Sequence, residues 1–142
     1  MAQVILAPDI YVNASVALGS PPEQVARRVL GSPQNSGKTT EWILARVRQM
    51  LSGVPSFKDE AVENQLRLIR GLVQVLADDR PHAPEQWVEA LTAAAKAAGV
   101  RRVVTDHPDL LEIETSDGVE FMSSEAWLLE VGTPPPPPET RH

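Results

Sequence analysis

Two short β-branched segments, separated by a long helical region, constrain the fold of this chain more than any other feature. The sequence predicts a buried strand over residues 4–6 in "VILAPDIYV" and another over residues 102–104 in "VRRVVT". Turn-forming residues follow each of them. A third apolar segment, "GVEFM", follows a short helical turn and precedes a last helix. Parallel strands need helical crossovers, so this order predicts an α/β fold with a small parallel sheet. We expect residues 4–6 to be central, residues 102–104 beside them, and helices on both faces.

Four segments between the first two strands carry the helical period. They are "SPPEQVARRVLG", "TEWILARVRQMLSG", "DEAVENQLRLIRGLVQVLADD" and "HAPEQWVEALTAAAKAAG". In the third segment, apolar residues at steps of four and three predict one long helix over residues 59–79, although Gly71 weakens it. In the fourth segment we expect Trp87 to face inward.

Composition limits the classes of function. The 142 residues suit one domain, expected over residues 1–131, and the proline-rich residues 132–142 are expected to be a disordered tail. A net charge of −6 argues against a broad electrostatic hold on nucleic acid. The absence of cysteine excludes thiol catalysis and disulfides. No signal peptide or long apolar run is visible, so we expect a cytoplasmic protein without a membrane partner.

The stretch "GSPQNSGKTT" resembles a phosphate-binding loop at first sight. Such a loop needs four residues between its first glycine and its Gly-Lys, but five separate Gly31 from Gly37. The segment before it is helical, whereas a phosphate-binding loop follows a strand. We therefore expect a loop in which Lys38 is exposed, Thr39 or Thr40 caps the next helix, and ATP is not bound.

Carboxylates are expected where the predicted strands end. Asp9 follows the first strand, Asp106 and Asp109 follow the second, and Glu89 lies on the intervening helix. Such a group could hold Mg²⁺ or Mn²⁺ and activate water. The same aspartates also suit turns and helix N-caps, and Glu89 also suits a solvent-facing stripe, so both interpretations stay open.

The segments "AAKAAGVRRVVTDHPDLLEI", "GVEFMSSEAWLLE" and "VILAPDIYVNASVAL" resemble the two ends of a PIN domain. The resemblance implies a three-layer α/β/α fold. It further implies a ribonuclease that depends on Mg²⁺ or Mn²⁺, with the metal ion held by three or four acidic residues. Proteins of this family are often toxins paired with an antitoxin, and they are commonly homodimers. In the middle of the chain, where the family has a further strand, only "KTT" remains as a candidate.

Matching the family position by position leaves few of its acids. Its first aspartate falls on Ala7, with Asp9 two residues later at an Asn/Ser position. Its second acid falls on Arg46, and its third falls on Glu89, which keeps the charge.

The family's fourth acid falls on His107. Asp106 comes one residue before this position, and Asp109 matches the later aspartate. Ala7, Arg46 and His107 are therefore the substitutions that degrade the site.

Three functions follow. In the first, the chain is a PIN-like binding or regulatory module whose acidic site is degraded, with Arg46 ion-paired to Glu89 or Asp106 and no cofactor. In the second, it is a divergent ribonuclease that binds RNA; Asp9, Glu89 and Asp106 hold the metal, and Asp109 joins them in catalysis. In the third, it is a scaffold that docks a protein partner through its proline-rich tail.

Overall fold

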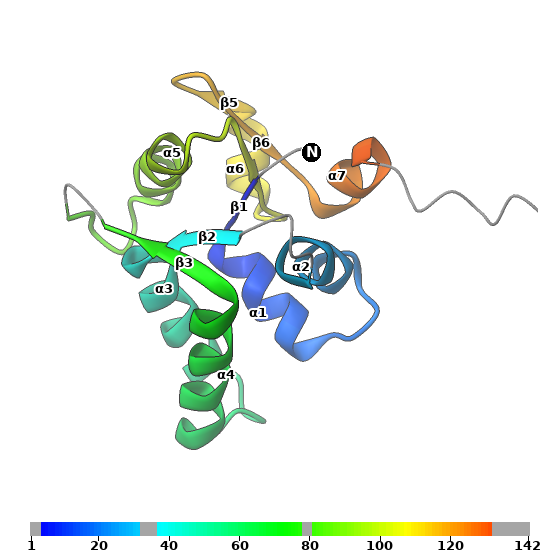
Figure 1. Cartoon of the computed structure of the whole chain (residues 1–142), viewed down its shortest axis with the longest axis vertical. Helices are drawn as coiled ribbons and strands as arrows, with labels where there is room; N and C mark the ends of the chain where they lie inside the picture. The colour runs from blue at the N-terminus through cyan, green and yellow to red at the C-terminus, as the bar shows by residue number, and fades with distance from the viewer. Residues whose placement is uncertain (1–3, 32–36, 78–80, 132–142) are drawn as a thin grey trace, which may run out of the picture.

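The computed structural model describes residues 4–31, 37–77 and 81–131 of the chain. Its centre is a six-stranded sheet of order β3-β2-β1-β4-β6-β5 (Figure 1). The strands are β1 (Ile5–Leu6), β2 (Gly37–Thr40), β3 (Val73–Leu76), β4 (Arg102–Val104), β5 (Thr115–Ser116) and β6 (Val119–Met122). All neighbours pair in parallel except β5, which runs antiparallel to β6. The sheet is therefore mixed at one edge, where a purely parallel sheet was expected.

Seven helices connect and cover these strands in the described residues. They are α1 (Pro8–Val16), α2 (Pro21–Gly31), α3 (Glu41–Ser52), α4 (Asp59–Leu72), α5 (Trp87–Ala98), α6 (Pro108–Ile113) and α7 (Ser124–Val131). Figure 1 shows α5 on one side of the sheet and α1 and α3 on the other. The expected three-layer α/β/α architecture is confirmed.

The central place of the first strand is also confirmed. Ile5 pairs with Lys38 of β2 on one side and with Val103 of β4 on the other. Ile5 and Val103 are fully buried, so the middle of the sheet is also the middle of the core. The chain after β1 does not form the expected turn, because Pro8 begins α1 directly, at a position where its missing N–H costs nothing.

The single long helix predicted over residues 59–79 is wrong. Helix α4 ends at Leu72, and Val73–Leu76 form β3, which pairs with the whole of β2. Val73 and Leu76 are three residues apart, so they fit the helical period as well as a strand. Gly71 weakens the helix just before the change, and the β-branched Val73 and Val75 favour the strand.

The segment around Lys38 is a strand and not the expected exposed loop. Lys38 is half-buried between β1 and β3, and its Nζ donates a hydrogen bond to the carbonyl of Ala98 at 3.4 Å. The expected helix cap is confirmed, because Thr40 Oγ1 accepts a hydrogen bond from the N–H of Ile43 at 3.3 Å.

The remaining expectations concern the proline-rich tail and membrane-spanning helices. The proline-rich tail, residues 132–142, lies outside the described residues. Within the described ranges, the structure has no helix of the length and apolar character that crossing a bilayer requires.

Candidate functional site

Asp9 joins the ends of the two central strands. It lies in the first turn of α1, directly after β1, and only 7% of its surface is exposed. Its Oδ1 accepts a hydrogen bond from Thr105 Oγ1 at 2.8 Å, and its Oδ2 accepts one from the N–H of Asp106 at 2.8 Å. Both donors directly follow β4, so one buried carboxylate holds the carboxyl ends of β1 and β4 together.

Asp106 extends this connection to the last helix. Its Oδ1 accepts a hydrogen bond from the N–H of Ser124 at 2.8 Å, and its Oδ2 accepts one from Ser124 Oγ at 2.7 Å. Ser124 is the first residue of α7 and is buried. A carboxylate at a helix N-terminus is further stabilised by the helix dipole. We call Asp9, Thr105, Asp106 and Ser124 the carboxylate chain.

Burial raises the pKa of Asp9 above its usual value, because the charged form loses water. The hydrogen bonds from the Asp106 N–H and from Thr105 oppose this rise, and the negative charge of Asp106 adds to it. The pKa of Asp9 is therefore raised because burial and the charge of Asp106 together outweigh the hydrogen bonds that the carboxylate accepts.

The other two predicted acids lie outside the carboxylate chain. Glu89 is exposed in the first turn of α5, and Asp109 is exposed in the first turn of α6. The N-cap of α6 is His107, not an aspartate: its Nδ1 accepts a hydrogen bond from the N–H of Asp109 at 3.2 Å. Across residues 4–31, 37–77 and 81–131, no group of three or more Asp, Glu, His or Cys side chains is placed to hold a metal ion.

Aromatic side chains gather at the same end of the sheet. Trp42, two residues after β2, meets Trp87 at the start of α5 edge to face, with ring centroids 5.8 Å apart. Trp87 in turn meets His107, with centroids 5.3 Å apart. The guanidinium carbon of Arg46 lies 5.8 Å from the centre of the Trp42 ring. We call Arg46, Trp42, Trp87 and His107 the aromatic row.

The contacts of Arg46 differ from the expected ones. Its Nη1 donates a hydrogen bond to Gln49 Oε1, and its buried Nε has no hydrogen-bond partner. Among the ion pairs of the described residues, none joins Arg46 to Glu89 or Asp106. The predicted salt bridge is therefore wrong. A nearby indole face takes the place of a carboxylate, since an arginine is attracted to the negative face of the ring.

Sequence reasoning missed four members of these two groups, namely Thr105, Ser124, Trp42 and Trp87. Thr105 and Ser124 carry a weak sequence signal, because each is a hydroxyl residue directly after a strand or at a helix start. Trp87 was expected to face inward with the apolar stripe of α5, but it is half-buried and contacts other rings. Trp42 and His107 lie 65 positions apart in the sequence, and no sequence spacing indicates that both contact Trp87.

The donor set does not fit the divalent metal that the resemblance implies. Mg²⁺ needs near-octahedral oxygen ligands, yet in the described residues only two carboxylates, Asp9 and Asp106, lie together, and each of their oxygens already accepts a hydrogen bond from a protein donor. Ala7 and His107 stand where the resemblance places two of the acids, and neither side chain has a carboxylate, while Arg46 carries a permanent positive charge.

Comparisons with known proteins add a likeness of fold. No family model matches the chain, and no curated protein matches its sequence. A similar solved structure is the crystal structure of Mycobacterium tuberculosis VapC20, described as a toxin that cleaves the sarcin-ricin loop. The two chains are 15% identical, the match covers 71% of this chain and 87% of that chain, and the TM-score is 0.48. No residue role follows from this likeness.

Proposed function

We propose that this chain is a PIN-like domain protein whose acidic site is catalytically degraded and which acts as a binding or regulatory module. One observation carries the proposal: Asp9 and Asp106 are linked in the carboxylate chain, and each of their oxygens accepts a hydrogen bond from Thr105, Ser124 or a backbone N–H. These carboxylates connect β1, β4 and α7, which is a structural role.

The aromatic row supports the same proposal. A site that binds a catalytic divalent cation gathers carboxylate oxygens around it. Here the Arg46 guanidinium lies near Trp42, Trp42 contacts the half-buried Trp87, and Trp87 contacts the half-buried His107. A mixed aromatic and cationic surface suits contact with another macromolecule better than it suits a divalent cation.

The alternative is a divergent metal-dependent ribonuclease. It is favoured by the closeness of Asp9 and Asp106, since the N–H of Asp106 itself donates to Asp9 at 2.8 Å. Each carboxylate oxygen has a second lone pair, so a cation that displaced one donor would find two acids side by side. In that case Glu89 and Asp109 would have to move toward the pair.

Titration of the full chain with Mn²⁺ by calorimetry, together with an RNA cleavage assay, separates the two functions. We expect no saturable Mn²⁺ binding and no cleavage by the wild-type protein, and we expect Arg46→Glu to create or strengthen Mn²⁺ binding. Asp117→Asn is a suitable acid control, because Asp117 lies in the turn between β5 and β6, with a positive φ of 50° that asparagine tolerates.

Tight Mn²⁺ binding and RNA cleavage by the wild-type protein would overturn the proposal if Asp9→Asn or Glu89→Ala abolished both and Asp117→Asn abolished neither. The ribonuclease function would then replace the binding module.

A further inference from the structure

Trp87 and His107 are the accessible half of the aromatic row. Both side chains are half-buried, and their ring centroids are 5.3 Å apart. Trp42, by contrast, is only 8% exposed, and its indole Nε1 donates a hydrogen bond to the carbonyl of Ala83 at 3.1 Å. Trp42 therefore supports the row from the inside, and a ligand would meet Trp87 and His107 first.

The polar atoms of this accessible half are hydrogen-bond donors. The indole N–H of Trp87 has no hydrogen-bond partner among the described residues. His107 Nδ1 accepts the hydrogen bond from the N–H of Asp109, so the neutral ring carries its proton on Nε2, which can donate. Neither ring then offers an acceptor atom of its own. A matching ligand therefore brings acceptors and apolar groups, and it needs no donor.

A run of prolines has this composition. Residues 134–138 of the proline-rich tail are five consecutive prolines. Proline has no backbone N–H, so the run offers carbonyl acceptors and apolar rings but no backbone donor. Pro-rich segments bind aromatic surfaces for this reason, and they lose little conformational entropy because the polyproline II helix is already formed. The chain thus carries both a row of donors and a segment of acceptors.

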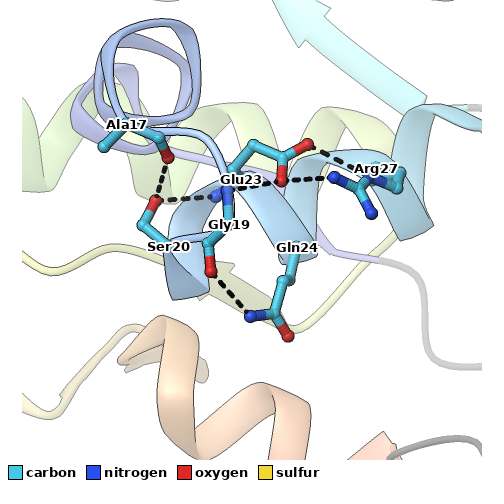
Figure 2. Close-up of polar contacts among 6 residues, drawn as sticks. All are labelled: Ala17, Gly19, Ser20, Glu23, Gln24 and Arg27. Atoms are coloured by element: carbon cyan, nitrogen blue, oxygen red, sulfur yellow. Dashed lines mark hydrogen bonds and ion pairs between the residues drawn. The ribbon is translucent and has the colours of Figure 1, made fainter.

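Helix α7, which precedes the tail, is fixed beside the row. Its first residue, Ser124, is bonded through its N–H and its hydroxyl group to Asp106, the residue before His107. Helix α7 also packs against α2. The start of α2 is itself held at the corner with α1, where Ser20 Oγ donates to the carbonyl of Ala17 at 2.6 Å (Figure 2). The fold therefore sets the point from which the tail departs.

The tail is long enough to return to the row. Helix α7 has eight residues, so Val131 lies about 11 Å along the helix axis from Ser124. Residues 132–138 span about 22 Å in the polyproline II conformation, about twice that length. Gly132 permits a reversal of direction after the helix. The run can therefore lie back along α7 and bring its last prolines to His107 and Trp87.

We propose that the proline-rich tail of this chain docks on its own aromatic row, with the last prolines of the run packed on Trp87 and His107. The contact is intramolecular, so a weak attraction suffices, because a short flexible connection gives an effective concentration in the millimolar range. The docked tail covers the surface that the proposed function offers to another macromolecule, and it thereby regulates that surface. The inference rests on the proposed binding surface, but it does not depend on whether the acidic site binds a metal.

A spin label on the last residue tests where the tail lies. The chain has no cysteine, so His142→Cys gives a single attachment site in the full chain. In the NMR spectrum, the label should strongly broaden the indole N–H signal of Trp87. Pro136→Gly together with Pro138→Gly keeps the length of the tail and removes two proline rings, so this glycine variant should lose the broadening. The amide signal of Leu18, which is 86% exposed between α1 and α2, should be equal in both proteins.

A peptide of residues 132–142 measures the competition with the attached tail. When the titration is followed by tryptophan fluorescence, the glycine variant should bind this peptide saturably. The wild-type protein should bind it about tenfold more weakly, because its own tail occupies the row. Trp87→Ala introduced into the glycine variant should abolish peptide binding. Leu68→Ala is the matched control, because Leu68 is 56% exposed on α4 and lies outside the row, so it should leave peptide binding unchanged.

The proposal is overturned if the wild-type protein and the glycine variant broaden the Trp87 signal equally, if they bind the peptide with equal affinity, or if Trp87→Ala leaves peptide binding intact. It is also overturned if spin-labelled chains mixed with isotope-labelled, unlabelled-tail chains give the same broadening, because the tail would then dock on another copy. None of these measurements uses Mn²⁺ or RNA, so the proposal can fail while the proposed function stands.

Discussion

Replacement of Asp9 by alanine tests whether the carboxylate chain stabilises the fold. The substitution leaves two donors without their acceptor, Thr105 Oγ1 and the N–H of Asp106. Thr105 is fully buried, so water does not readily replace the lost partner of its hydroxyl group. Each buried donor left unsatisfied costs about 1–3 kcal/mol.

The removed carboxylate offsets part of this loss. Burial raises the pKa of Asp9, which means that the fold disfavours its ionised form. We therefore expect Asp9→Ala to lower the free energy of unfolding at neutral pH by about 2–4 kcal/mol, less than the sum of the upper limits for two orphaned donors. Asp9→Asn should cost less, about 1–2 kcal/mol, because the amide oxygen keeps the hydrogen bond from the Asp106 N–H and only the Thr105 hydroxyl loses its acceptor.

Urea unfolding followed by tryptophan fluorescence measures both values, since the chain has three tryptophans. If Asp9→Ala unfolds within about 0.5 kcal/mol of the wild-type protein, the range expected of an ordinary surface substitution, Asp9 does not hold the strand ends together. Loss of stability in Asp9→Asn equal to that in Asp9→Ala would also contradict the argument, because it would assign the effect to charge and not to the two hydrogen bonds.

Further predictions concern pH, Ser124, Arg46 and Lys38. The pKa of Asp9 in the folded protein lies above the usual 3.8, so the protonated side chain contributes its full stabilisation below pH 3.8, and this stabilisation is lost as the pH rises through the folded-state pKa. Urea unfolding between pH 3 and 7 should show this loss of stability in the wild-type protein but not in Asp9→Asn. Ser124→Ala removes a hydrogen bond to a carboxylate and should cost about 1.5–3 kcal/mol in the same assay, and a cost near zero would mean that Asp106 does not hold α7. Arg46→Ala should cost only about 0.5–1 kcal/mol, the range of a cation–π contact at an exposed site, whereas a loss of about 3–5 kcal/mol, the cost of breaking a buried ion pair, would indicate a salt bridge after all. Calorimetry with ATP should detect no binding, and tight binding that is lost in Lys38→Ala would show that the strand β2 can open into a phosphate-binding loop.

The sequence by itself determined the class of fold and the place where polar groups gather. Residues 4–6 and 102–104 are short segments rich in β-branched residues, and helical segments lie between them, so a parallel sheet with a central first strand followed from local pattern and crossover geometry. Asp9 and Asp106 were placed correctly at strand ends for the same reason. The class of fold and the positions of these aspartates depend on residues that are neighbours in the sequence, so the local sequence pattern is sufficient to predict them.

Tertiary structure alone decided which groups meet and what they do. The four-residue strand β3 fits a helical period in sequence and becomes a strand because β2 pairs with it. Arg46 lies near an indole and not beside an acid because Trp42 is one turn away on its own helix, whereas Glu89 is exposed on another helix. Asp9 and Asp106 accept hydrogen bonds from residues up to 97 positions away. Contacts of this range depend on how the helices and strands pack, and local periodicity carries no information about that packing.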